Sequence, residues 1–412
     1  MDNNMSKNMS NDQEHDPRVK GAGTSGKSIP KGSGAGPKVT KSSSPLDIGK
    51  ELMQKLPDLA NNLAEATKDG LAEAKDTLLD TKDAIIEAKD KIMDSLSDKD
   101  LEGVEITDAL QTSRDFCQCH EIKPRGSCLV IQGGSLRGVH SLGVLNALDQ
   151  AGLHFDCVMG VSAGSLSGLA YLSGQLERAR RLMVDLIEDR EYIGNLESLV
   201  KDKSWINFDF MFAGAPDKLE PFDLDAFMAN PSEFVCNATD IETGEAVRFS
   251  KSDCQDIQLA AVASSTLPLV SAPTKIGDHY YMDGGVAEPI LYTKAIEDGY
   301  QKIVVILTRQ EGFRKEEFTL SMQKAVTTVY RKYPRFAKTL LQQEMRYNAF
   351  IEELEKLAQA HPDRFFLIYP QAKVEVNMMN RSRELMQKYL DQGQREAEAI
   401  MPQLKTFLGS YA

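Results

Sequence analysis

The stretch that decides the fold is Phe155-Asp-Cys-Val-Met-Gly160-Val161-Ser162-Ala163-Gly164-Ser165, which continues with small and apolar residues to Gly174. Its pattern predicts a short apolar strand, a sharp turn that spells G-x-S-x-G, and a helix. The two glycines leave room for the chain to fold back, which exposes the Ser162 hydroxyl in a strained backbone geometry. We therefore expect a nucleophilic serine at a sheet edge. The simpler alternative is a strand–turn–helix connection whose serine only caps the helix.

A second glycine-rich turn precedes this one in the chain. Cys128 to Ile131 is typical of a buried strand and runs into Gln132-Gly133-Gly134-Ser135-Leu136-Arg137-Gly138, after which an apolar helix is expected. Consecutive backbone N–H groups in such a turn form a cradle for an anion, either a nucleotide phosphate or the oxyanion of an acyl transfer. Because successive strand–helix units place their turns at the same edge of a parallel sheet, this cradle should lie beside Ser162.

A nucleophilic serine needs a base, and the sequence after Ser162 offers three candidates. His279 and His361 are the histidines that follow it, in the chain order expected of a Ser–His–Asp hydrolase. Asp283 ends an apparent strand just before two glycines, so its carboxylate could face the same edge. An aspartate with its ordinary pKa of about 3.9 is a weak base, and partial burial would raise that pKa. The residues alone leave the choice open.

Taken together, these segments resemble the patatin-like phospholipase family. Three motifs carry the resemblance: Gly133-Gly134-x-x-Arg137-Gly138, Gly160-Val161-Ser162-Ala163-Gly164 and Asp283-Gly284-Gly285. The segment Ala263-Ser264-Ser265-Thr266-Leu267-Pro268 also resembles a family segment. The matches follow the order of the family and span about residues 127–312, which is under half of the chain.

The resemblance implies a Ser–Asp dyad without a histidine, in which Ser162 is the nucleophile and Asp283 the base. The residues that it implies for the oxyanion hole and its loop are Gly133, Gly134, Arg137, Gly138 and Ala163. Arg137 would either brace that loop or meet a lipid phosphate. The chain departs from the family at Ser135, where a third glycine is usual, and a side chain there restricts the φ angle of the loop.

The resemblance also implies a three-layer α/β/α fold with a mostly parallel central sheet, and chemistry that needs no metal or other cofactor. We expect a lipid acyl hydrolase of the phospholipase A or lysophospholipase type, acting on a phospholipid or lysophospholipid through an acyl-enzyme. Two alternatives stay open. One is a Ser–His–Asp esterase of the α/β-hydrolase type, and the other is a non-catalytic scaffold that uses the helices expected before this domain.

Composition divides the chain into five segments. Residues 1–45 are rich in Asn, Ser, Gly, Lys and Pro and predict a disordered tail. Residues 46–100 repeat Lys-Asp every seven residues in step with an apolar stripe, which predicts acidic amphipathic heptad helices. Residues 101–126 are expected to be a linker and residues 127–312 the catalytic core. Residues 313–412 are expected to form a C-terminal helical extension with one strand, packed on the core.

The charge of the chain limits its partners. The 412 residues carry a formal net charge of −13 and have a pI near 5.1, which argues against a nucleic-acid partner. The helices of residues 46–100 could bind a partner helix, touch a lipid surface as a peripheral contact, or lie against their own domain. The sequence has no apolar run of 18 residues and no apolar signal segment, so we expect a cytoplasmic protein with reduced cysteines.

Four further segments complete the expected domain. Leu176 to Glu191 predicts an amphipathic helix, and Lys302 to Leu307 a central parallel strand. Trp205 to Phe222 is rich in aromatic residues and suits either a lid with an acyl-chain groove or core packing, of which we favour core packing. Arg381 to Leu408 predicts a mainly helical segment with a break near Pro402.

Overall fold

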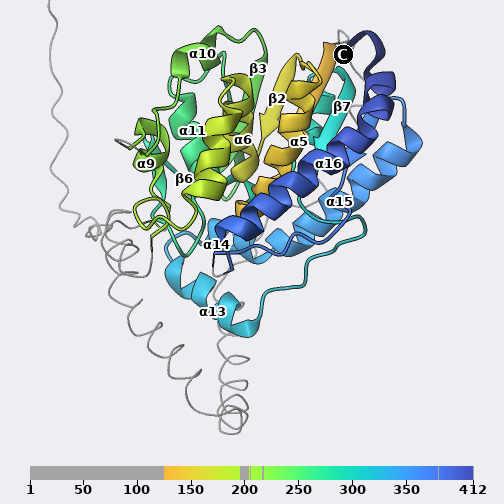
Figure 1. Cartoon of the computed structure of the whole chain (residues 1–412). Helices are drawn as coiled ribbons and strands as arrows, with labels where there is room; N and C mark the ends of the chain where they lie inside the picture. Colours follow the sequence, from red (N-terminus) through yellow and green to blue (C-terminus); the bar gives the residue numbers. More distant parts are fainter. Residues whose placement is uncertain (1–124, 195–203, 205, 216–217, 379, 412) are drawn as a thin grey trace, which may run out of the picture. The chain divides into compact units, whose positions relative to one another are not determined.

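The computed structural model describes residues 125–194, 204, 206–215, 218–378 and 380–411 (Figure 1). The tail predicted for residues 1–45 and the heptad helices predicted for residues 46–100 lie outside the described residues, as does nearly all of the linker predicted for residues 101–126. The described part covers most of residues 127–312 and 313–412.

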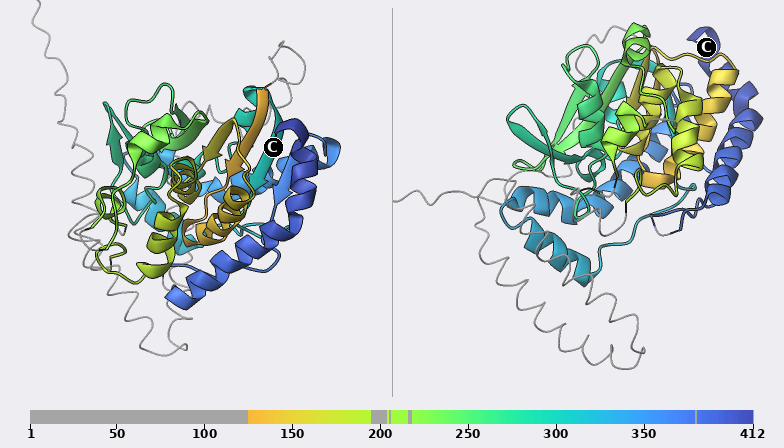
Figure 2. Two further views of the ribbon diagram at one scale, coloured as in Figure 1. Left: turned by 45° about the horizontal axis from the view of Figure 1, so that its top comes forward. Right: turned by 60° about the vertical axis from the view of Figure 1, so that its left-hand side comes forward.

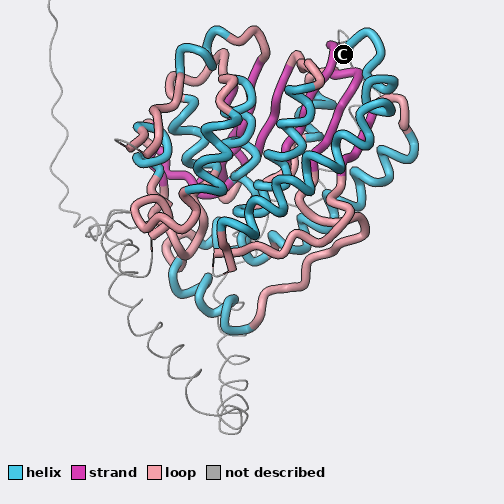
Figure 3. Tube along the Cα trace, in the orientation of Figure 1, coloured by secondary structure: helices cyan, strands magenta, loops and turns pink. Residues whose placement is uncertain are grey.

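A mixed sheet of eight strands forms the centre of the described chain (Figures 1 and 3). The strands are β1 (Arg125–Ile131), β2 (Cys157–Gly160), β3 (Glu233–Asp240), β4 (Ala246–Ser250), β5 (Thr274–Ile276), β6 (His279–Asp283), β7 (Tyr300–Ile306) and β8 (Phe365–Ile368). Their order is β5-β6-β3-β2-β1-β7-β8, and β4 pairs with β3. The run from β3 to β8 is parallel, whereas the pairs β3–β4, β3–β6 and β5–β6 are antiparallel. The expected mostly parallel sheet is confirmed.

Helices connect and cover the strands. They are α5 (Gly138–Gln150), α6 (Ala163–Leu172), α7 (Leu176–Arg180), α9 (Phe208–Ala213), α10 (Leu224–Ala229), α11 (Ile257–Ser264), α12 (Tyr292–Glu297), α13 (Leu320–Val329), α14 (Pro334–Leu341), α15 (Gln343–Ala360) and α16 (Arg383–Leu408). Several begin at a polar N-cap whose side chain accepts a backbone N–H three residues on. These caps are Asn207, Asp223, Asp256, Thr319 and Ser382.

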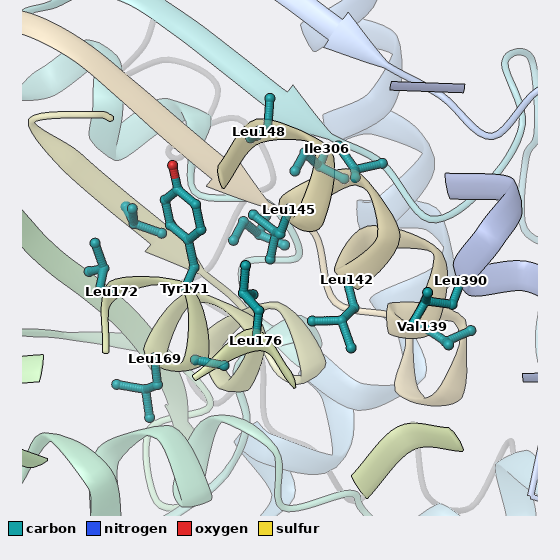
Figure 4. Close-up of a cluster of buried hydrophobic side chains, with 14 of the residues drawn as sticks. Val139, Leu142, Leu145, Leu148, Leu169, Tyr171, Leu172, Leu176, Ile306 and Leu390 are labelled. Carbon is teal, nitrogen blue, oxygen red and sulfur yellow. The ribbon is translucent and has the colours of Figure 1, made fainter. Parts of the chain in front are cut away.

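The sheet is buried between two layers of helices (Figure 2). Successive residues of a strand point to opposite faces, and β1 shows this directly. Leu129 and Ile131 pack with α5, α6 and α16, whereas Cys128 and Val130 pack with α12 and α15. Figure 4 shows the first face, where Leu145 and Leu148 of α5 lie beside Ile306 of β7, and Val139 of α5 lies beside Leu390 of α16. Because both faces are covered, the parallel strands are almost continuously apolar, and the three-layer α/β/α arrangement is confirmed.

The long helix α16 packs against α5 at close range. A Cβ atom on Gly393 would lie 2.1 Å from the carbonyl oxygen of His140, and one on Gly143 would lie 2.0 Å from that of Leu390. Only glycine therefore allows this approach. Further along, Phe407 of α16 contacts Phe366 of β8 with ring centroids 5.4 Å apart. The helix thus fixes both α5 and the β8 edge of the sheet.

The break expected near Pro402 is absent, and α16 continues through it to Leu408. A proline removes one backbone N–H and cannot satisfy the carbonyl four residues earlier, here that of Glu398. Both residues lie on the exposed side of the helix, where water can satisfy that carbonyl. Leu404 and Leu408 are fully buried on the other side, so packing holds the helix together.

The helix expected from Leu176 to Glu191 is shorter than predicted. Regular α-helix ends with α7 at Arg180, and a π-helical segment follows over Arg181–Asp185. Leu182 and Val184 are both buried, although residues two apart point in different directions on a regular α-helix. The wider π-helical turn lets both side chains reach the core. The spacing of apolar residues along the sequence does not reveal this turn.

The described aromatic residues of the segment 205–222 pack into the core. Phe210 is buried and stacks on Tyr192, with ring centroids 5.8 Å apart. Phe222 contacts the rings of Phe212 and Phe227. The core-packing interpretation therefore holds for these residues, and Trp205 lies outside the described residues. Among the described helices, none is long and apolar enough to cross a lipid bilayer.

The close crossing of α5 and α16 yields a stability prediction. The variant Gly393→Val should lower the free energy of unfolding by about 1–3 kcal/mol, because the new side chain collides with the backbone of α5. The measurement is the Tm from differential scanning calorimetry. The control is Ala399→Val on the exposed side of the same helix, which changes helix propensity without a collision. Equal Tm values for the two variants would contradict the packing described here.

Candidate active site

The glycine-rich turn and the serine turn begin side by side. β1 and β2 are parallel neighbours, and their last residues, Ile131 and Gly160, are direct partners in the register. The chain leaves both strands at the same level and at the same sheet edge. The sequence-based expectation that the two turns meet there is therefore confirmed.

Ser162 is held in a strained turn between β2 and α6. Its φ and ψ angles are 54° and −127°, a region that residues with a Cβ atom rarely adopt. The flanking glycines are needed for space: a Cβ atom on Gly160 would lie 2.4 Å from the carbonyl oxygen of Gly164. The Ser162 N–H donates to the Oγ of Ser264 at 2.8 Å, which ties the turn to the end of α11. The sequence contained Ser264 in a family-like segment but gave no sign of this contact.

The structure brings Ser162 and Asp283 together. The Ser162 hydroxyl donates to Oδ2 of Asp283 at 2.6 Å, and the backbone N–H of Gly285 donates to Oδ1 at 2.7 Å. Both oxygens of the carboxylate are thus occupied, and its orientation is fixed. The two residues are only 7% and 6% exposed, so this contact is almost free of competing water.

Asp283 reaches this edge in a way that the sequence did not suggest. β6 runs antiparallel to β3, so its C-terminal end would normally point away from the turns at the ends of β1 and β2. However, β3 is longer than β2: Cys236 is level with Gly160, and β3 continues to Asp240. Asp283 pairs with Ala238, in the part of β3 that extends past the end of β2. This extension places the carboxylate level with Ser162.

Burial gives the Asp283 carboxyl the pKa of a usable base. Removal from water raises its pKa from 3.8 to about 6. The hydrogen bonds from Ser162 and Gly285 and the positive charge of Lys315 act in the opposite direction and limit the rise. At neutral pH the carboxylate is therefore mostly ionised, yet much more basic than an exposed aspartate.

Neither histidine candidate lies near Ser162. His279, at the start of β6, is 59% exposed and its Nδ1 lies 3.0 Å from Oδ2 of Asp240. His361 follows the end of α15 and is exposed. Among the described residues, no histidine lines the cavity that contains Ser162. The arrangement required for a Ser–His–Asp hydrolase is not found in this part of the chain.

The glycine-rich turn presents free backbone donors beside Ser162. Within the described chain, the N–H groups of Gly133, Gly134 and Ala163 have no acceptor. The turn runs close to Ser162, since a Cβ atom on Gly133 would lie 2.9 Å from the Cβ of Ser162. Thr308, which follows β7, fixes the turn: the Thr308 hydroxyl donates a hydrogen bond of 2.9 Å to the carbonyl oxygen of Gly133.

Gly138 differs from the other residues that the family resemblance implies for the oxyanion hole. Its N–H donates to the carbonyl of Ser135 within the short 3-10 turn Ser135–Arg137, so this N–H is not free to bind an oxyanion. A Cβ atom on Gly138 would lie 3.1 Å from the Cβ of Ala163, so the glycine instead permits the two turns to pack together. Arg137 projects from the same 3-10 turn into the cavity.

Ser162 and Asp283 line one cavity of about 350 Å³ together with Gly133, Gly134 and Arg137, whereas Gly138 and Ala163 are not among its lining residues. Ser135 adopts a φ of 51°, the left-handed region that explains the usual glycine at this position. Ser162 and Leu269 are the other non-glycine residues with positive φ in the described chain, and all three line this cavity. Such strain costs about 1–3 kcal/mol per residue and tends to cluster at functional sites.

The cavity wall combines apolar and cationic side chains. The apolar ones include Leu267, Leu269, Val286, Phe318, Met322 and Leu340. Several of these belong to a small apolar cluster beside β6, α13 and α14. The cationic ones are Arg137, Arg309 and Lys315.

Two parts of the chain match known family models. Residues 129–296 match the family model described as patatin-like phospholipase. Residues 333–409 match a model described as a domain of unknown function, DUF6363. The first range holds every residue of the candidate site that the sequence predicted, and the second spans α14, α15, β8 and α16.

Individual relatives are distant. The uncharacterized protein YjjU of Escherichia coli is 26% identical over 192 residues, which cover 45% of this chain and 53% of that protein. An uncharacterized NTE family protein of Mycobacterium tuberculosis, Rv1063c, is 24% identical over 174 residues, or 41% and 46% of the two chains. The chain spans about half the length of the curated relatives it matches. The crystal structure of VipD from Legionella pneumophila aligns with a TM-score of 0.36 and 15% identity over 70% of this chain and 67% of that one.

The raised pKa of Asp283 predicts a pH-dependent stability difference. At pH values below the pKa that Asp283 has in the unfolded chain, the carboxyl is protonated in both the folded and the unfolded state, so it does not lower the stability of the fold. As pH rises through the folded pKa of about 6, the folded state must hold a buried charge, at a cost of roughly 3 kcal/mol. The variant Asp283→Asn should therefore raise Tm relative to the wild type at pH 8 and much less at pH 4.5.

The measurement is thermal unfolding of both proteins at the two pH values. The exposed Asp225→Asn is the matched control for the loss of one negative charge. A Tm increase in Asp283→Asn that is the same at both pH values, or that appears only at low pH, would contradict the conclusion that burial raises the pKa of Asp283.

Proposed function

We propose that this chain, whose residues 129–296 belong to the patatin-like phospholipase family, is a lipid acyl hydrolase that cleaves carboxylic esters through Ser162 and Asp283. One observation carries the proposal: Ser162, whose backbone is strained, donates a 2.6 Å hydrogen bond from its hydroxyl to the buried Asp283 carboxylate in the cavity. A structural serine needs neither strain nor a desolvated acceptor, whereas a nucleophile benefits from both.

The first half of the proposed reaction acylates the enzyme. Asp283 Oδ2 accepts the Ser162 proton as Oγ attacks the ester carbonyl carbon, forming a tetrahedral oxyanion. The intermediate then collapses, the C–O bond to the alcohol breaks, and the leaving oxygen takes the proton from Asp283. The free N–H groups of Gly133, Gly134 and Ala163 supply donors for the oxyanion, which is the group that needs stabilisation in this step.

The second half returns the enzyme to its starting state. Asp283 deprotonates a water molecule, which attacks the acyl-enzyme, and Ser162 recovers its proton from Asp283 as the carboxylic acid leaves. One carboxylate thus serves as base and acid in turn. A pKa near 6 suits both roles at neutral pH, since the group is ionised before each attack and still accepts a proton during it.

The apolar part of the cavity wall supports an acyl chain as the substrate's hydrophobic portion. The cavity has a volume of about 350 Å³, which lies near the lower end of the range of roughly 300–1,000 Å³ typical of ligand pockets. This size favours a substrate with one acyl chain, of the lysophospholipid type, over one that inserts two chains. Contact of residues 46–100 with a membrane or a partner helix stays a prediction.

The main test is loss of turnover in two variants that keep the fold. Ser162→Ala removes the nucleophile and Asp283→Ala removes the base, so each should reduce kcat for a lysophospholipid by at least about 10³-fold. Fatty-acid release measures turnover, and far-UV circular dichroism checks the fold. His279→Ala and His361→Ala are the controls and should retain activity. Loss of turnover in His361→Ala with retention in Asp283→Ala would instead favour a Ser–His–Asp hydrolase.

The pH profile of kcat/KM should report the Asp283 carboxyl. Because the free enzyme acts only when Asp283 is ionised, activity should be flat above a pH of about 6 and fall tenfold per pH unit below it. Lys315 lowers this pKa through its charge, so Lys315→Gln should move the acid limb to higher pH. An acid limb near pH 4, or one unmoved by Lys315→Gln, would contradict the assignment.

A further inference from the structure

Two guanidinium groups in the cavity lack the partners that buried arginines usually have. Nε of Arg137 and Nε of Arg309 are both buried without a hydrogen-bond acceptor, and neither side chain forms an ion pair with any described residue. Arg248, by contrast, is held by Glu288 and Glu297. Buried polar atoms are normally hydrogen-bonded, so the two half-buried arginines present unused donors to whatever occupies the cavity.

The two charges also oppose each other. Burial, and secondarily the positive charge of Arg309, lower the pKa of Arg137 to about 10. Repulsion between these two like charges is unfavourable, and a bound anion would offset it. Lys315, the third cation of the cavity, already has a partner, because its Nζ lies 2.9 Å from Oε2 of Glu344.

The fold holds Arg309 beside the glycine-rich turn. β7 is the other parallel neighbour of β1, and its last residue, Ile306, pairs with Ile131. The chain beyond β7 is fixed to the turn, since the N–H of Thr308 donates to Oε1 of Gln132 at 2.7 Å. Cζ of Arg309 lies over the ring of Phe313, 4.4 Å from its centroid, a cation–π contact that uses none of the N–H donors.

The sheet order separates this cationic group from the apolar part of the wall. Arg309 follows β7, on one side of the strands β1 and β2 that carry the oxyanion turn and Ser162. Val286 follows β6, on the other side, where it packs with residues of α13 and α14. Ser162 therefore lies between a cationic and an apolar region of one cavity.

Resting on the proposed function, we infer that Arg309, together with Arg137, binds a phosphate group of the substrate on the β7 side of Ser162. The acyl chain occupies the apolar side. The substrate class is then a monoacyl ester whose alcohol carries a phosphate close to the ester bond. Guanidinium groups suit this ligand because their planar donors match phosphate oxygens in pairs.

The test compares two esters that differ only in the phosphate. They are 1-octanoyl-glycerol 3-phosphate and 1-octanoyl-glycerol, each used below its critical micelle concentration so that aggregation plays no part. The wild-type chain should show a kcat/KM at least about tenfold higher for the phosphate ester. Arg309→Gln should lower kcat/KM for that ester by about 10–100-fold, the loss typical of a charged hydrogen bond, and change the neutral ester less than about threefold.

Two further variants sharpen the comparison. Arg309→Lys keeps the charge but not the paired donors, so it should recover part of the preference for phosphate. Arg314→Gln is the matched control: Arg314 is 37% exposed, pairs with Glu355 and does not line the cavity. It should leave both kcat/KM values unchanged. If Arg309→Gln lowers both esters equally, or if Arg314→Gln has the same effect, phosphate binding by Arg309 is overturned.

A binding measurement separates this inference from the proposed function and distinguishes the source of the phosphate. Glycerol 3-phosphate and inorganic phosphate are titrated into the wild type, Ser162→Ala and Arg309→Gln by isothermal calorimetry. Glycerol 3-phosphate should bind the first two proteins and bind Arg309→Gln at least about tenfold more weakly. Equal binding to all three, or binding of inorganic phosphate alone, would overturn the inference. Absence of turnover for both esters with binding intact would contradict only the proposed function.

Discussion

The hydrogen bond from the Ser162 hydroxyl to the Asp283 carboxylate is the interaction on which the candidate site depends. The pKa of the Asp283 carboxyl reflects two opposing effects. Burial of the carboxyl raises the pKa, while two hydrogen bonds and the Lys315 charge keep it near 6. Weaker burial would leave an aspartate too acidic to accept the proton. Fewer hydrogen bonds would leave it protonated at neutral pH and unable to act as a base.

The sheet supplies the rigidity that this pair requires. β1, β2 and β7 are parallel neighbours, and the chain after each contributes one part of the cavity wall: the glycine-rich turn, Ser162 and Arg309. The strain at Ser135, Ser162 and Leu269 is unfavourable locally, and the buried three-layer core around it offsets that cost. In the same cavity, the N–H groups of Gly133 and Gly134 and the Nε groups of Arg137 and Arg309 have no hydrogen-bond acceptor among the described residues. This is the pattern expected where binding, rather than folding, satisfies polar groups.

Much of this site could be predicted from the sequence because its turns are local. G-x-S-x-G between an apolar strand and a small-residue helix located Ser162, and the family resemblance singled out Asp283. What the sequence could not show depends on contacts between distant segments. The extension of β3 past β2, which brings Asp283 level with Ser162, is a matter of strand register across the sheet. The contacts that position Ser264 and Arg309 leave no periodic pattern in the sequence. The uninterrupted helix through Pro402 reflects packing that overrides a local propensity.

The most direct measurement of the central claim is the rate at which a fluorophosphonate probe modifies Ser162, followed by intact and peptide mass spectrometry. The probe needs only an activated serine and an oxyanion site, so no knowledge of the natural lipid enters. The account predicts stoichiometric labelling of Ser162 in the wild-type chain and a rate at least about 10²-fold lower in Asp283→Asn. Labelling of Asp283→Asn at the wild-type rate, or modification of a serine other than Ser162, would contradict it.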